Sequence, residues 1–178
     1  MNGDPARPVP LTGQGREQAR ELGVQVAGLP LELCLHTLFG RTRETAEIAL
    51  GARPVPLRVE ALLGDVDVGQ LEGATLDEYR AWKRAHTRDD PFPGGESLND
   101  AARRYSLGFR RLVESEWSCA LVVCHDIPIR YALNALAGSD QLDGPAQDIP
   151  NATPYLFEGD ALRLAAERIE QLAYSSPP

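Results

Sequence analysis

The sequence has no long hydrophobic run: none of its apolar stretches approaches the roughly 20 consecutive residues that a membrane-spanning helix needs. Its opening, Met1-Asn2-Gly3-Asp4, carries neither the basic region nor the apolar stretch of a secretory signal. We therefore predict a cytoplasmic protein without a membrane partner.

Cysteine is scarce, and the usual metal-binding patterns are missing. The three cysteines, Cys34, Cys119 and Cys124, lie in or beside apolar runs, where a small buried thiol is more common than a disulfide. There is no CxxC pair and no HExxH segment, so the sequence predicts no metal site and no cofactor. The net charge of −8 argues against a nucleic-acid partner, because phosphate backbones bind basic surfaces.

What is present is the composition of a compact domain. Hydrophobic residues make up 43% and charged residues 25% of the 178 residues, and no repeat or linker divides the chain. The sequence therefore predicts one domain over residues 1–178.

Helical and strand-like segments alternate along this domain. The capping-box pattern Thr75-x-x-Glu78 opens one predicted helix, and Ser97-x-x-Asp100 opens another. Helices are predicted at 12–27, 41–50, 75–82, 97–113, 127–136 and 160–172, and strands at 31–36, 57–63, 119–124 and 151–157. This alternation predicts an α/β fold, a three-layer α/β/α arrangement with a mostly parallel sheet.

Polar residues follow two of the predicted strands. His125 follows the apolar strand that ends at Cys124, and Arg41 begins the helix after the strand that ends at His36. In open α/β sheets ligands bind at the carboxyl ends of the strands, where helix N-termini also point, so this pair predicts an anion site. Each residue also has a bland interpretation, Arg41 as a solvated helix residue, His125 as a structural histidine and Asp65 as a loop acid. Only their combination indicates function.

Five segments of the chain form a pattern. They are PLTGQGREQA (10–19), TLFGRTRETA (37–46), LGDVDVGQLEG (63–73), PGGES (93–97) and VVCHDIPIR (122–130). In the same order they resemble the PLTxxGxxQA, SPLxRAxQTA, LxExDxGxWEG, PGGES and VVSHGGPIR segments of the histidine phosphatases, the phosphoglycerate mutase-like group.

The resemblance implies the phosphoglycerate mutase-like fold and hydrolysis of phosphomonoesters through a phosphohistidine. Arg41 and His125 would bind phosphate, and Asp65 and His125 would be the catalytic residues, with Asp65 as the proton donor. The implied ligand is a small phosphorylated substrate or free phosphate.

The sequence departs from the family pattern at its start. The family's RHG or RHA motif, which ends the first strand and supplies the nucleophilic histidine, is expected upstream of Pro10, and residues 1–9 contain nothing like it. Neither His36 nor His86 fits that motif. We expect Met1 to be an internal methionine of a longer protein, with impaired catalysis in the chain as given. The alternative is a non-catalytic phosphate-ligand or protein-binding module on the same fold.

Other departures fall inside the matched segments. Asp65 replaces the usual glutamate, and Gly40 and Leu71 replace an arginine and a tryptophan that are common there. Asp126 replaces the glycine after the second histidine. This brings negative charge near the phosphate site, where it would select against some phosphate esters or recognise an amine or hydroxyl group on the substrate.

Two further hypotheses follow. Cys124-x5-Arg130 has the spacing of cysteine-dependent phosphatases, but the intervening Asp126 would repel phosphate and Pro128 lacks a backbone N–H. The second concerns the fold: without the family's first strand, the strand before His125 should keep unpaired backbone groups. We expect local rearrangement or self-association into a homo-oligomer to cover them.

Overall fold

The centre of the molecule is a short parallel sheet. The computed structural model describes residues 3–175, so Met1, which the sequence predicts to be internal to a longer protein, lies outside the described residues. Strands β1 (Leu33–His36), β2 (Leu57–Val59) and β3 (Ala120–Val123) are parallel and lie in the order β2-β1-β3. All four residues of the central strand β1 are buried, as expected for a strand covered on both faces.

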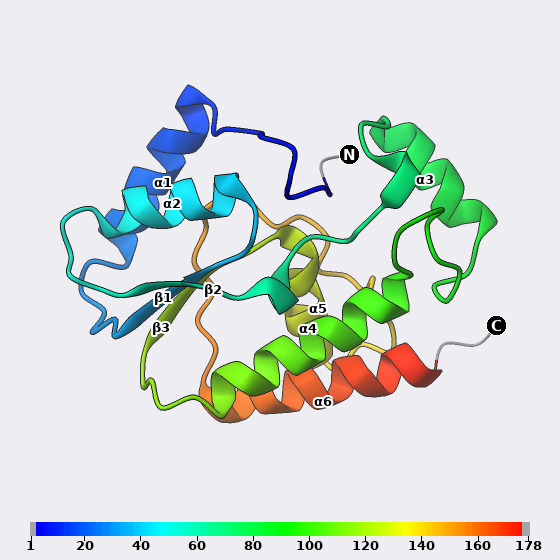
Figure 1. Cartoon of the computed structure of the whole chain (residues 1–178). Helices are drawn as coiled ribbons and strands as arrows, with labels where there is room; N and C mark the ends of the chain where they lie inside the picture. The colour runs from blue at the N-terminus through cyan, green and yellow to red at the C-terminus, as the bar shows by residue number, and fades with distance from the viewer. Residues whose placement is uncertain (1–2, 176–178) are drawn as a thin grey trace.

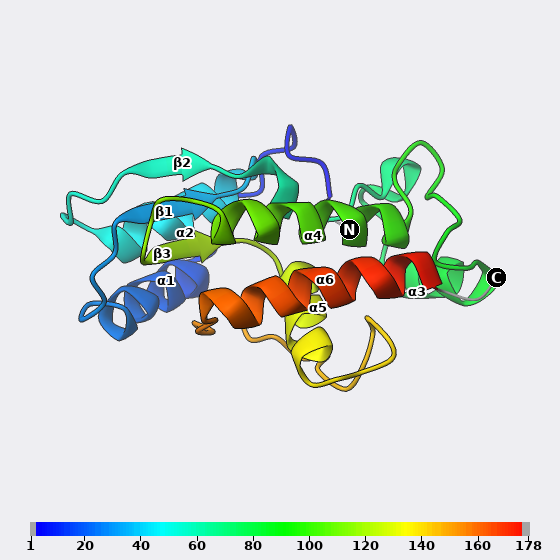
Figure 2. The ribbon, with the colours of Figure 1, turned by 90° about the horizontal axis from the view of Figure 1, so that it is seen from below.

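Helices cover both faces of this sheet. Helices α1 (Gly13–Gln25) and α2 (Gly40–Leu50) lie on one face, and α4 (Leu98–Val113) and α6 (Gly159–Ser175) lie side by side on the other (Figure 1, Figure 2). Helix α5 (Asp126–Leu136) packs against α6, while α3 (Leu76–Ala85) stands away from the sheet. The three-layer α/β/α fold predicted from the sequence is confirmed.

Local sequence explains where the helices begin. Thr12 caps α1 by accepting a hydrogen bond from the Gly15 backbone N–H. The predicted capping box forms at Thr75 at the start of α3, and Ser97 and Asp100 form a second one at the start of α4. In the described part of the chain, no helix is long and apolar enough to cross a membrane.

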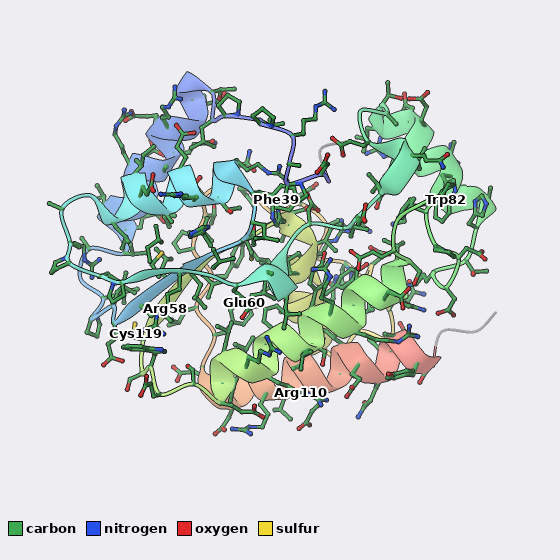
Figure 3. All side chains as sticks on the ribbon, in the orientation of Figure 1. Phe39, Arg58, Glu60, Trp82, Arg110 and Cys119 are labelled. Atoms are coloured by element: carbon green, nitrogen blue, oxygen red, sulfur yellow. The ribbon has the colours of Figure 1, made fainter. Side chains whose placement is uncertain are left out.

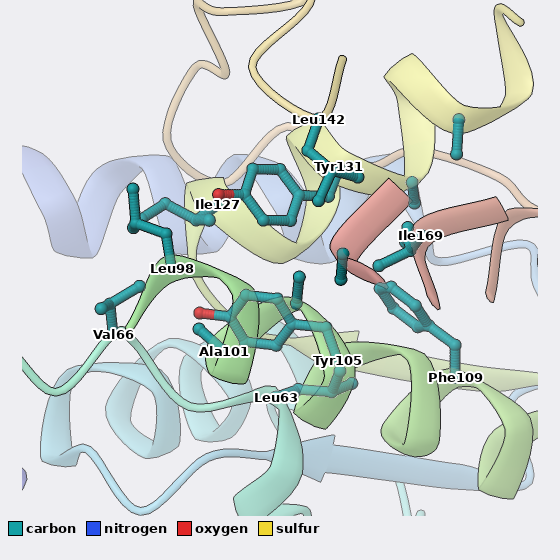
Figure 4. Close-up of a cluster of buried hydrophobic side chains, with 14 of the residues drawn as sticks. Leu63, Val66, Leu98, Ala101, Tyr105, Phe109, Ile127, Tyr131, Leu142 and Ile169 are labelled. Carbon is teal, nitrogen blue, oxygen red and sulfur yellow. The ribbon is translucent and has the colours of Figure 1, made fainter. Parts of the chain in front are cut away.

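The apolar residues form one large cluster and two small ones. The large cluster joins α4, α5 and α6 around Tyr105 and Tyr131, and Leu63 reaches it from the short 3-10 helix η1 (Ala61–Leu63) (Figure 4). A Cβ at Gly108 of α4 would lie 2.8 Å from Leu63 Cδ2, so the glycine lets η1 approach α4 closely. The two small clusters lie on the opposite face of the sheet, between the strands and helices α1 and α2.

Two predicted strands differ from the structure. The segment 57–63 divides into β2 and η1. The strand predicted at 151–157 is wrong: these residues form no strand. Pro150 and Pro154 lack backbone N–H groups, and Ala152 has a φ of 52°, in the left-handed region. The apolar composition of this segment therefore does not make it a strand.

The second edge of β3 is unpaired within residues 3–175. Strand β3 pairs with β1 alone, and its side chains line a cavity of about 1440 Å³. Apolar residues of α1, α4 and the segment 147–159 form the other walls. Local rearrangement, one of the two ways in which this edge was expected to be covered, therefore does not pair it within the described residues. Its coverage by self-association remains a hypothesis.

Candidate active site

Three side chains from distant parts of the sequence meet at the carboxyl ends of β1 and β3. Arg41 is the second residue of α2, Asp65 lies in the loop after η1, and His125 is the N-cap residue of α5. Arg41 Nη2 lies 2.9 Å from Asp65 Oδ2 and 3.2 Å from His125 Nδ1, and that carboxylate oxygen lies 3.5 Å from the same ring nitrogen. The predicted site residues therefore converge on one point.

Phe39 shapes the side of the site next to α2. The Arg41 guanidinium lies over the Phe39 ring, 4.3 Å from its centroid, and the ring packs edge-on against His125 with centroids 4.6 Å apart. Phe39 also occupies the N-cap position of α2 without a capping side-chain hydrogen bond (Figure 3). Sequence analysis did not identify Phe39 as part of the site. An aromatic residue where Ser, Thr, Asp or Asn is usual could have indicated it.

Arg104 fixes the loop that carries Asp65. From α4 its guanidinium donates to the backbone carbonyls of Leu62 at 2.8 Å, Gly64 at 3.0 Å and Asp65 at 3.1 Å, and it pairs with Glu96. These bonds connect three backbone carbonyl groups of residues 62–65 to helix α4. Sequence analysis also missed this residue, because an arginine in an amphipathic helix has the pattern of a solvated side chain.

The Asp65 carboxyl group is poised to exchange a proton near neutral pH. Burial raises the pKa of Asp65 to about 6, against the opposing influence of the Arg41 guanidinium and of the Val66 backbone N–H that donates to Oδ1. The Asp126 carboxylate adds to the rise. A carboxyl group with a pKa near the working pH can act as a general acid and then as a base.

His125 is neutral under the same conditions. Burial, followed by the positive charges of Arg41 and Arg104, lowers the pKa of the imidazole to about 3. The side chain is only 5% exposed. As the pH falls, Asp65 is therefore protonated before His125.

The other two histidines lie outside this cluster. His36, at the end of β1, donates from Nδ1 to the Thr37 carbonyl at 2.7 Å. His86 stacks on Trp82, with ring centroids 4.2 Å apart, and Figure 3 shows Trp82 near the right-hand edge of the molecule, away from Phe39. Neither lines the cavity that contains Arg41, Asp65 and His125.

Asp126 adds a carboxylate beside His125 to the lining of this cavity. It follows His125 at the start of α5, lines the same cavity, and lies 3.9 Å from Arg130. The described residues contain no group of three or more His, Cys, Asp or Glu side chains that could hold a metal ion.

The cysteine-phosphatase hypothesis finds no support in the surroundings of Cys124. Burial raises the pKa of this thiol to about 12, and its sulfur lies 3.8 Å from the His125 carbonyl oxygen, toward which the S–H donates. A thiol of this kind carries almost no thiolate at neutral pH. The Cys124→Ser variant is therefore expected to keep its phosphate affinity, measured by calorimetry, within about twofold. Loss of all phosphatase activity in this variant alone would support the thiolate mechanism instead.

Comparison with known proteins identifies the family. A sequence profile of the Histidine phosphatase superfamily (branch 1) matches residues 5–175. The chain belongs to this superfamily. Members of this superfamily act on phosphorylated small molecules.

Individual relatives agree with this assignment. The chain is 29% identical over 137 residues to "Probable phosphoglycerate mutase GpmB" of Salmonella choleraesuis, covering 72% of this chain and 64% of that protein. It therefore spans just under two thirds of the length of that relative. Among solved structures, the alpha-ribazole phosphatase of Shigella flexneri shares 24% identity with a TM-score of 0.68, covering 82% of this chain and 73% of that one. A putative alpha-ribazole-5'-P phosphatase of Escherichia coli shares 26% identity with a TM-score of 0.67, covering 82% of this chain and 72% of that one.

Proposed function

We propose that the Arg41–Asp65–His125 site binds the phosphate group of a small phosphomonoester and, in the complete form of the protein, supports its hydrolysis. The observation that carries this proposal is the contact of one guanidinium with both a carboxyl group of raised pKa, at 2.9 Å, and a neutral imidazole, at 3.2 Å. A guanidinium binds phosphate oxygens through paired hydrogen bonds, and the carboxyl group supplies a proton beside it.

The family resemblance implies a two-step reaction. A nucleophilic histidine forms a P–N bond while the P–O bond to the leaving group breaks, and Asp65 gives its proton to the leaving oxygen. The ionised Asp65 then accepts a proton from water, whose oxygen displaces the histidine from phosphorus. Arg41 stabilises the charge that spreads over the remaining phosphoryl oxygens.

A non-catalytic binding module is the second candidate. It is favoured by the fact that residues 3–175 bring a single histidine, His125, to this cavity. Both candidates predict that phosphate or vanadate raises the melting temperature of the chain. Steady release of p-nitrophenol from p-nitrophenyl phosphate by the purified chain would exclude the binding module. Binding without turnover would support it, and absence of any anion effect would contradict both.

The role of Asp65 as a proton donor predicts an unusual pH dependence of stability. Its pKa rises from 3.8 to about 6 on folding, so the folded protein binds this proton more tightly than the unfolded chain. Asp65 therefore does not lower the free energy of unfolding below pH 3.8, where it is protonated in both states. As the pH rises through 6, the free energy of unfolding falls by about 3 kcal/mol by linkage.

The Asp65→Asn variant lacks this titration. Relative to the wild type, its free energy of unfolding should improve by about 3 kcal/mol between acidic and alkaline pH, as measured by urea denaturation across that range. A difference from the wild type that stays constant with pH would contradict the raised pKa of Asp65.

A further inference from the structure

Thr37, the residue after β1, contacts the side of His125 that faces away from Arg41 and Asp65. Its Oγ1 lies 3.0 Å from His125 Nε2, whereas His125 Nδ1 faces the other two site residues. Thr37 is only 1% exposed. A buried hydroxyl beside a buried ring nitrogen leaves few possible arrangements of the hydrogen atoms.

The contacts of the imidazole determine which nitrogen carries its hydrogen. A guanidinium has only donors, so at 3.2 Å Arg41 must donate to His125 Nδ1, which then presents a lone pair. The ring is neutral at pH 7 and has a single N–H. That hydrogen is therefore on Nε2, where it can donate to Thr37 Oγ1.

The hydroxyl groups around Thr37 agree with this direction. Thr42 Oγ1 donates to the Phe39 carbonyl at 2.8 Å, so it can accept from the Thr37 backbone N–H at 3.2 Å and from the Thr37 hydroxyl at 2.9 Å. The Thr37 oxygen keeps two lone pairs, one for the Phe39 N–H at 3.5 Å and one for His125 Nε2–H. Every hydrogen in this series of hydrogen bonds, from His125 to the Phe39 carbonyl, has an acceptor. Successive bonds point the same way and therefore polarise one another.

We propose that Thr37 is a positioning residue that holds His125 as the Nε2–H tautomer, so that Nδ1 accepts from Arg41 and orients its guanidinium for the phosphate group. This inference rests on the proposed function for its biological meaning. In this tautomer the Nδ1 lone pair accepts from Arg41 Nη2 at 3.2 Å, which orients the guanidinium beside Asp65. Thr37 thus acts through His125 and does not itself contact the ligand.

The test begins with the ligand-free protein. Long-range ¹H–¹⁵N spectra at neutral pH should show His125 Nε2 as the protonated nitrogen and Nδ1 as the unprotonated one. The Thr37→Val variant removes the acceptor, so its spectra should show the ring changing to the Nδ1–H tautomer or to a mixture. The affinity of this variant for vanadate should fall by about tenfold, because an Nδ1–H ring no longer accepts from Arg41 and the guanidinium loses the contact that orients it. The Thr37→Ser variant should restore both the tautomer and the affinity.

Thr45→Val is the matched control. It removes a threonine hydroxyl from α2 that donates to the Arg41 backbone carbonyl at 2.8 Å, and it should leave the His125 tautomer unchanged. Wild-type spectra with hydrogen on Nδ1, or an unchanged tautomer in Thr37→Val, would overturn the proposal. If the valine variant does not fold, the wild-type spectra and the serine variant still decide it. Since the tautomer is read without ligand, a wild type that binds no vanadate would contradict the proposed function and leave this test intact.

Discussion

Replacement of Arg41 by glutamine is expected to abolish the rise in melting temperature that phosphate or vanadate gives to the wild type. Arg41 is the charged group that contacts both Asp65 and His125, and its guanidinium lines the cavity between them. Hydrogen bonds to charged groups contribute about 1.5–3 kcal/mol each, so losing a bidentate pair should weaken binding on the order of 100-fold or more. Isothermal calorimetry with vanadate measures this directly.

Two further variants make the Arg41 experiment specific. Arg41→Lys keeps the charge but loses the planar pair of donors, and should bind with intermediate affinity. Arg43→Gln removes an exposed guanidinium two residues away that pairs with Glu47, and should bind as the wild type does. Wild-type affinity in Arg41→Gln would mean that the anion binds elsewhere and that the proposed function is wrong.

Replacement of His125 by asparagine is expected to make the protein less sensitive to acid. Folding lowers the pKa of His125 from 6.5 to about 3. Between these pH values the imidazole is therefore protonated in the unfolded chain but not in the folded protein. The contribution of this pKa shift to the free energy of unfolding is fully present above pH 6.5 and is lost as the pH falls toward 3. Linkage gives a loss of about 3 kcal/mol between neutral pH and pH 4 in the wild type, and none from this position in the variant.

Asp65 titrates in the opposite sense over much of the same range, so the two effects partly cancel in the wild type. The difference in free energy of unfolding between His125→Asn and the wild type is therefore the quantity to follow, by urea denaturation at several pH values. His86→Asn serves as the control, since it removes a histidine that stacks on Trp82 outside the cavity. Parallel pH profiles for His125→Asn and the wild type would contradict the lowered pKa.

The fold was predictable because its determinants are local. The capping boxes at Thr75 and Ser97 mark helix starts by side chains only three residues apart. The carboxyl ends of parallel strands share one edge, which is why residues at 41 and 125 could be expected to meet. The prediction of a single domain over the whole chain remains a prediction.

Other features could not be read from the sequence because they depend on distant partners. Arg104 reaches carbonyl groups about forty residues earlier in the chain, and nothing near it in the sequence indicates this. The segment 151–157 has strand-like composition, but a strand exists only where another strand offers paired hydrogen bonds. Thr37 lay inside a recognised motif, yet its contact with His125 depends on the register between β1 and β3.

The site lies where segments from the two faces of the sheet meet, because the apolar residues are divided into clusters on opposite faces. Arg41 belongs to α2, which packs with the small clusters, while Arg104 ties the Asp65 loop to α4 and the large cluster. A phosphate group bound by Arg41 beside Asp65 would therefore contact two segments that pack on opposite faces of the sheet. Its binding energy would then oppose local unfolding of either segment.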